Sequence, residues 1–146
     1  MRQPRRDDET GSILPLTIFY GFVALVLVLI VVAASSLYLE RKRLFTLADG
    51  AALVGAEAFD LGEVQQTAGG ARPRLQSTDV ATAVTGFVAG SAGSRFESLE
   101  VLRAESTDGR SATVELAAYW RPPVVSLLVP EGFRIEVTAV ARSVFD

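Results

Sequence analysis

A long uncharged stretch near the start of the chain, from Gly11 to Leu39, most constrains what this sequence can fold into. Its central part, residues 22–32, consists only of Phe, Val, Ala, Leu and Ile. A helix needs about 20 mostly apolar residues to cross the hydrocarbon core of a bilayer. We therefore predict a transmembrane helix over residues 11–39, with Thr10 or Ser12 as its cap and Pro15 in its first turn.

A cleaved signal peptide is the alternative interpretation of the same stretch. Arg2, Arg5 and Arg6 would form its basic start, and Ala33-Ala34-Ser35 its cleavage site. The apolar part of a signal peptide is usually only about 7–15 residues long. The stretch in this chain is longer than that, so a permanent anchor is favoured.

The rest of the 146 residues leaves room for one further domain of ordinary size. We predict four segments along the chain. They are a tail over residues 1–10, the transmembrane helix over 11–39, a helical stalk over 40–61 and a small α+β domain over 62–146.

The stalk is predicted to be an amphipathic helix, because apolar residues recur there at steps of three and four. That stripe consists of Leu44, Leu47, Ala51, Val54, Ala58 and Leu61. On the same segment, Ala48, Ala52 and Ala56 form a ladder of small side chains that allows another backbone to come close. We predict that these three alanines form a helix-packing interface. The pattern leaves open whether they pack against the protein's own sheet or against a partner.

A second helix is predicted after a loop that occupies residues 62–77. Ser77 or Thr78 should cap it, and Gly90 should end it. Its apolar face is formed by Val80, Ala83, Val84, Phe87 and Val88.

Three strands are predicted in the last third of the chain. Apolar and polar residues alternate over residues 111–120 and again over 133–141, and a less regular strand covers residues 96–105. Asp108-Gly109 indicates a hairpin with a type I′ turn, and residues 122–130 should form a loop with one helical turn. The predicted fold class is α+β: a transmembrane helix extended by an amphipathic helix, followed by a helix packed on a three-stranded antiparallel sheet.

The composition excludes most catalytic designs. The chain has no cysteine and no histidine, which removes thiol nucleophiles, the commonest general base and most transition-metal sites. The acidic residues are scattered over predicted strands and turns, as is typical of a solvated surface. We predict no catalytic residue, no cofactor, no metal and no small-molecule substrate, and therefore a protein that is not an enzyme.

The charged residues also limit the possible partners. The net charge is −3 and Lys42 is the only lysine, so the chain has no basic surface for nucleic acid. Arg41, Lys42 and Arg43 directly follow the apolar stretch and are predicted to form a basic cluster among lipid headgroups. Because three basic residues also precede the stretch, charge alone does not orient the helix in the membrane.

Three segments resemble the TadE/TadG-like proteins of the tight-adherence (Flp) pilus assembly systems. They are Gly11-Ser12-Ile13-Leu14-Pro15-Leu16, the basic step Leu37-Tyr38-Leu39-Glu40-Arg41-Lys42-Arg43-Leu44, and Ala48-Asp49-Gly50-Ala51-Ala52-Leu53-Val54-Gly55-Ala56. The resemblance implies a single-pass protein of the cell envelope, with its N-terminus in the cytoplasm and its C-terminal domain outside. It further implies a role in the assembly or anchoring of thin adhesive pili, with other pilus-assembly or pilin-like proteins as partners.

One departure from the pilin-like relatives concerns processing. Those relatives that are cleaved carry Glu five residues after the cleavage-site glycine, whereas Leu16 stands five residues after Gly11. We therefore predict that the N-terminus is kept. Two alternatives to a pilus role stay open: a general single-pass envelope protein, and a membrane-tethered binding module.

Overall fold

A computed structural model provides the structure of the protein. It describes residues 13–59, 66–67, 70–71, 74–92, 95–122, 125–127 and 129–143. The predicted caps Thr10 and Ser12, the tail over residues 1–10, and Asp60 and Leu61 lie outside the described residues.

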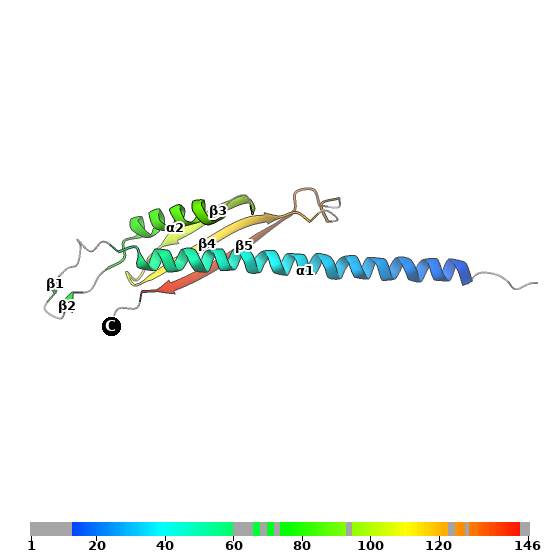
Figure 1. Cartoon of the computed structure of the whole chain (residues 1–146), viewed down its shortest axis with the longest axis horizontal. Helices are drawn as coiled ribbons and strands as arrows, with labels where there is room; N and C mark the ends of the chain where they lie inside the picture. The colour runs from blue at the N-terminus through cyan, green and yellow to red at the C-terminus, as the bar shows by residue number, and fades with distance from the viewer. Residues whose placement is uncertain are drawn as a thin grey trace, which may run out of the picture.

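The dominant element is helix α1, which runs unbroken over 45 residues from Ile13 to Glu57 (Figure 1). The predicted transmembrane helix and the predicted stalk are therefore one continuous helix. Its first half projects away from the rest of the chain, and its second half lies along the sheet. Pro15 falls in the first turn, where a missing N–H is tolerated because the position four residues earlier lies before the start of the helix.

Except for two short strands between the helices, the other elements follow in the order that the sequence predicts. They are β1 (Gln66–Thr67), β2 (Gly70–Ala71), α2 (Ser77–Ala92), β3 (Glu97–Glu105), β4 (Ser111–Trp120), the short 3-10 helix η2 (Val125–Leu127) and β5 (Phe133–Arg142). The small β1–β2 hairpin lies in the segment that was predicted to be only a loop.

The three long strands form an antiparallel meander in the order β3-β4-β5. The register of β4 and β5 is regular from Ser111 opposite Arg142 to Trp120 opposite Phe133. The β3–β4 ladder has one register shift between Glu97 and Glu100, where Ser98 has a positive φ of 49°, and another between Val101 and Arg103. With α1 and α2 covering one face of this sheet, the predicted α+β fold class is confirmed (Figure 1).

The core lies between the sheet and the two helices. Alternate residues of β4 and β5 point into it, as their period of two requires. From the helices, Leu44 and Ala51 of α1 and Val80 and Val84 of α2 are completely buried. Gly55 of α1 marks a close approach, because a Cβ there would lie 3.1–3.2 Å from side chains of both α2 and β4.

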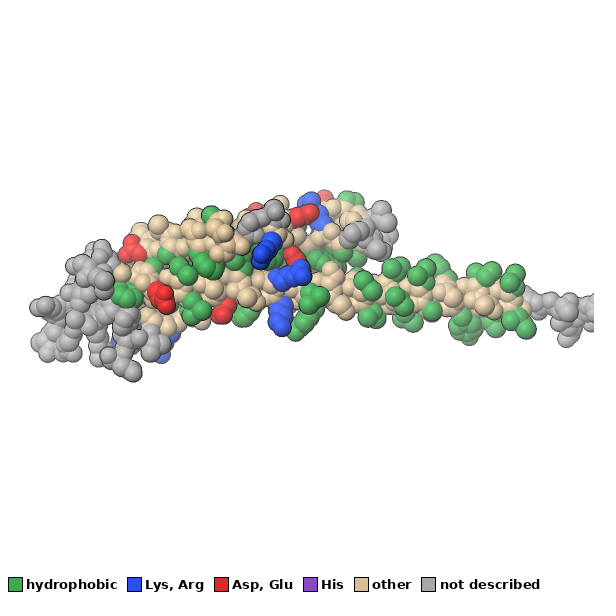
Figure 2. Space-filling view, viewed as in Figure 1, with side chains coloured by type: hydrophobic (Ala, Val, Ile, Leu, Met, Phe, Trp, Pro, Cys, Tyr) green, Lys and Arg blue, Asp and Glu red, His purple; other side chains and the backbone are tan. Residues whose placement is uncertain are grey.

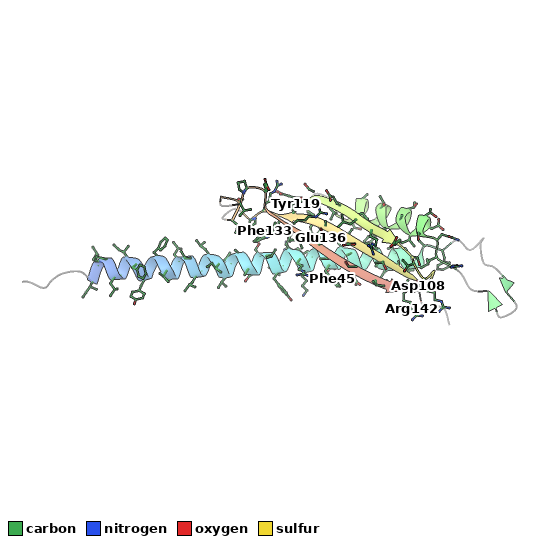
Figure 3. The ribbon with its side chains drawn as sticks, turned by 180° about the vertical axis from the view of Figure 1, so that it is seen from behind. Phe45, Asp108, Tyr119, Phe133, Glu136 and Arg142 are labelled. Atoms are coloured by element: carbon green, nitrogen blue, oxygen red, sulfur yellow. The ribbon has the colours of Figure 1, made fainter. Side chains whose placement is uncertain are left out.

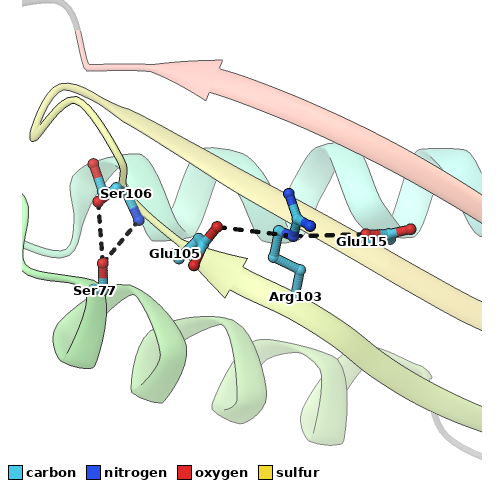
Figure 4. A network of polar contacts seen from close by, with 5 residues as sticks. All are labelled: Ser77, Arg103, Glu105, Ser106 and Glu115. Atoms are coloured by element: carbon cyan, nitrogen blue, oxygen red, sulfur yellow. Dashed lines mark hydrogen bonds and ion pairs between the residues drawn. The ribbon is translucent and has the colours of Figure 1, made fainter.

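Helix α2 departs from its prediction at both ends. The carbonyl of Gln76 accepts hydrogen bonds from the amides of Asp79 and Val80, so Gln76 stands in the cap position. The Ser77 hydroxyl instead exchanges hydrogen bonds with the backbone of Ser106, at 3.1 and 3.2 Å (Figure 4). At the other end the helix continues through Gly90 to Ala92, so the prediction that Gly90 ends it is wrong. Gly90 has no positive φ, and nothing lies near it that would forbid a helical backbone.

The β3–β4 hairpin exists as predicted, but its turn is not type I′. That turn needs positive φ at both central residues, and only Gly109 has one, at +67°. The carboxylate of Asp108 organises the loop by accepting hydrogen bonds from the amides of Arg110 and Ser111, at 2.8 and 2.6 Å. The Asp108-Gly109 dipeptide alone suggested a type I′ turn. The loop instead takes the shape in which the Asp108 side chain binds the amides that follow it.

Asp108 should make the stability of the domain depend on acid pH. Hydrogen bonds from Arg110 and then Ser111 lower the pKa of its carboxyl group from 3.8 to about 2. A lowered folded-state pKa stabilises the fold above about pH 4, and this contribution is lost as the pH falls towards 2. We expect Asp108→Ala to melt below the wild type near neutral pH, with the gap closing between about pH 4 and about pH 2. Thermal melts of the full chain in a non-ionic detergent would measure this. Asp49→Ala, at an exposed position of α1, is the control. A difference in melting temperature between Asp108→Ala and the wild type that stays constant with pH would contradict the role of Asp108.

The solvent face of the sheet carries ion pairs between neighbouring strands. Arg103 of β3 lies 3.8 Å from Glu105 and 3.8 Å from Glu115 of β4 (Figure 4). The side chain of Arg103 is 55% exposed, that of Glu105 42% and that of Glu115 26%. Ion pairs that water reaches in this way add little to stability. The outer face is therefore a solvated surface, as the scattered acidic residues predicted.

Candidate functional site at the membrane-proximal end of the domain

The first half of α1 is a candidate membrane span. Every residue from Ile13 to Val32 is exposed. The helix is long and apolar enough to cross a bilayer by length and composition. Figure 2 shows hydrophobic side chains along the visible face of this projecting part, and Lys and Arg side chains gathered where the domain begins. The site of interest is this transition.

The alanine ladder lies inside the domain. Ala48 and Ala52 are completely buried and Ala56 is 2% exposed, all within the core cluster. On the same part of α1, a Cβ at Gly50 would lie 3.1 Å from the ring of Phe87 in α2. The three alanines therefore lie in the core that α1 forms with α2 and the sheet.

The predicted basic cluster is exposed on α1. Arg43 pairs with Glu40 at 3.6 Å, one helical turn earlier. Within the described part of the chain, no ion pair is found for Arg41 or Lys42. These two cations are therefore available for headgroups or for an acidic partner.

A contact that the sequence did not predict joins the domain to the transmembrane segment. The indole N–H of Trp120, at the end of β4, donates to the hydroxyl of Ser36 at 3.3 Å. Ala33 also packs against the core cluster. Both residues fall within the predicted span over 11–39, so the domain begins before the uncharged stretch ends. The only available signal was the Ser35-Ser36 pair, the first polar side chains after Tyr20.

Aromatic and charged side chains surround this contact. Phe133 of β5 lies 6.2 Å from Trp120 between ring centroids and is half exposed (Figure 3). Arg121 lies 3.5 Å from Glu97 and 5.8 Å from the ring centroid of Tyr119. We call these residues, together with Ser36, the junction.

Arg134 extends the charged part of the junction. It pairs with Glu136 at 2.8 Å and with Glu100 at 3.6 Å. Partial desolvation works against its charge, but a hydrogen bond with Tyr119 and the two carboxylates outweigh this and raise the pKa of Arg134. Arg134 is therefore charged at any physiological pH.

Two hollows open beside the junction. A hollow of ≈290 Å³ includes Ser36, Glu40, Trp120 and Arg121 in its lining. A larger groove of ≈680 Å³ between α1 and α2 is lined by Arg43, Thr46, Leu47, Phe87, Ser91, Arg95 and Phe96. Among the described residues, no group of three His, Cys, Asp or Glu side chains could hold a metal ion. The arrangement offers cationic and apolar contacts to lipid or protein.

An apolar helix that continues without a break into a compact domain defines a single-pass membrane protein with one α+β domain. Residues 11–58 match the family model described as "Putative Flp pilus-assembly TadE/G-like". This match confirms the TadE/TadG-like resemblance, and it covers the predicted span and residues 40–58 of the predicted stalk. Comparisons with curated proteins and with solved structures gave no match.

Proposed function

We propose that this chain is a membrane-anchored structural or assembly component of a tight-adherence (Flp-type) pilus, in a minor pilin-like or anchoring role. The observation that carries the proposal is the family match over residues 11–58. That segment contains both the candidate span and the part of α1 that is buried in the domain core. Its partners would be other pilus-assembly or pilin-like proteins.

The continuity of α1 supports a mechanical role. Since the buried residues from Leu44 to Ala56 belong to the same helix as the span, the domain is not attached through a flexible linker. A force or displacement at the domain would be transmitted directly to the membrane segment. Holding or positioning a fibre needs such a rigid connection and no chemical step.

We further propose the orientation that the family resemblance implies. Residues 1–10 would lie in the cytoplasm, and residues 40–61 and 62–146 outside it. The unprocessed N-terminus would leave the full span as a permanent anchor. A cut at Ala33-Ala34-Ser35 would separate the span from Ser36, which binds Trp120.

Deletion of the gene in its own host tests the proposed function. We expect the deletion strain to lose most surface pili in electron micrographs while pilin protein is still made. The full chain should restore the pili. A chain whose residues 13–32 are replaced by a cleavable signal peptide should not, because its domain is released from the membrane. Normal piliation of the deletion strain would contradict the proposal and favour a general envelope protein.

Two further measurements separate the finer roles. The chain should be found in sheared pili if it is pilin-like, and only in membranes if it is an anchor. Orientation can be read from Thr107→Cys, because Thr107 is exposed and the chain has no other cysteine. A membrane-impermeant maleimide should label this cysteine in spheroplasts before lysis. Labelling only after lysis would reverse the proposed orientation.

A further inference from the structure

Because α1 is one unbroken helix, the depth of its apolar part in the membrane fixes how far the domain stands from the bilayer. The fully exposed part, Ile13 to Val32, comprises 20 residues, which a helix extends over about 30 Å. The hydrocarbon core of a typical bilayer is about 30 Å thick. The exposed part of α1 is thus just long enough to cross the membrane.

The domain starts where that length ends. Ala33 is the first residue of α1 that packs against the core, and Ser36 accepts the hydrogen bond from Trp120. In Figures 1 and 3, the end of the sheet where β4 ends and β5 begins lies beside this part of α1 and faces the projecting helix. We propose that the junction rests in the lipid headgroup layer of the membrane that α1 spans.

The charges of the junction argue against a deeper position. A bilayer edge at Leu39, where the uncharged stretch ends, would sink the domain by about 10 Å relative to an edge after Val32. Glu97, Arg121 and Arg134 would then approach hydrocarbon, where charged side chains are costly. With the edge at Ala33, the same groups lie among headgroups and water.

The composition of the junction fits a headgroup layer. Trp and Tyr rings favour the membrane–water boundary, and arginine reaches phosphates with planar, strongly hydrogen-bonding groups. Strand β4 ends with the partly exposed Tyr119 and with Trp120, which is only 7% exposed and lies behind the surface. The half-exposed Phe133 and the exposed Arg121 form the surface beside them. One end of the sheet therefore presents both kinds of contact towards the span.

This placement changes the expected surroundings of the basic cluster. Arg41–Arg43 would lie about 12–15 Å along the helix from Ala33, past most of the headgroup layer. Arg43 lines the α1–α2 groove together with Arg95, and in this placement that groove lies on the water side of the headgroups. The headgroup contacts nearest the hydrocarbon would come from Arg121 and Arg134.

The single tryptophan of the chain tests the proposal without any mutation. The full-length protein would be reconstituted into phosphatidylcholine–phosphatidylglycerol vesicles that contain brominated lipid. We expect lipids brominated near the carbonyl end of the acyl chain to quench Trp120 fluorescence at least twice as strongly as lipids brominated near the chain terminus. No quenching by either lipid would overturn the proposal, because the junction would then stand clear of the bilayer.

Spin labels at single cysteines give an independent depth. Phe133→Cys marks the junction, Arg142→Cys the other end of the same strand, and Val26→Cys the middle of the span. The Phe133 label should show an oxygen-to-nickel-chelate accessibility ratio between those of the other two labels. A ratio equal to that of Arg142 would place the junction in water, and a ratio equal to that of Val26 would place it in hydrocarbon. Either result overturns the proposal, whatever the role of the protein in pili.

Discussion

Replacing Leu44 by alanine is expected to lower the free energy of unfolding of the domain by about 2–5 kcal/mol. Leu44 belongs to the predicted stalk, but its side chain is completely buried and is among the largest of the core. Removal of three carbon atoms there loses their burial and leaves a cavity between α1 and the sheet. Denaturant unfolding of the full chain in detergent, followed by Trp120 fluorescence, measures the change.

Leu53→Ala is the matched control for this prediction. It makes the same chemical change on the same helix, but Leu53 is 54% exposed. Its effect should be within about 0.5 kcal/mol, as is usual for surface substitutions. Equal effects of the two variants would mean that the stalk is not part of the domain core.

Ala52→Leu is expected to destabilise the domain by about 1–3 kcal/mol, because it inserts a larger side chain into a closely packed seam. Ala52 is completely buried, and the adjoining Gly55 already lies within 3.1–3.2 Å of side chains of α2 and β4, measured from where a Cβ would stand. The same unfolding experiment applies, with Thr46→Leu on the exposed side of the helix as control.

The outcome also separates an internal seam from a partner interface. If the alanine ladder serves only the fold, Ala52→Leu should lower stability, and piliation should fall only as far as the amount of folded protein falls. If it binds a partner, stability should hold while co-purification with assembly proteins is lost. A variant that is neutral in both respects would contradict the buried position of Ala52.

Sequence periodicity predicted the elements because each local pattern has a local physical cause. The uncharged stretch marks α1 because charges are costly in hydrocarbon. The alternation of Ala112, Val114, Leu116, Ala118 and Trp120 marks β4 because successive side chains of a strand point to opposite faces. All five are buried, and the strand has the predicted bounds. The pairing of β3 with β4 followed from the hairpin signal between them.

Predictions that rested on one or two residues were less successful, because those residues had competing partners. Gly90 was predicted to end α2, yet the helix continues to Ala92. Asp108-Gly109 was predicted to form a type I′ turn, yet the Asp108 carboxylate binds the following amides and shapes a different loop. Ser77 was a candidate cap, but the hairpin lies close enough for its hydroxyl to bind Ser106. Such choices depend on which groups the fold brings near.

The sequence by itself thus determined the span, the amphipathic continuation, the strands and the absence of cysteine and histidine chemistry. Only the tertiary structure decided what each face meets. A ladder of small residues such as Ala48, Ala52 and Ala56 shows that a close neighbour is possible, but the neighbour itself is set by residues distant in sequence, here those of α2 and the sheet. The bond from Trp120 to Ser36 joins residues 84 positions apart. No periodicity encodes such a contact, because it exists only once the sheet has folded back along α1.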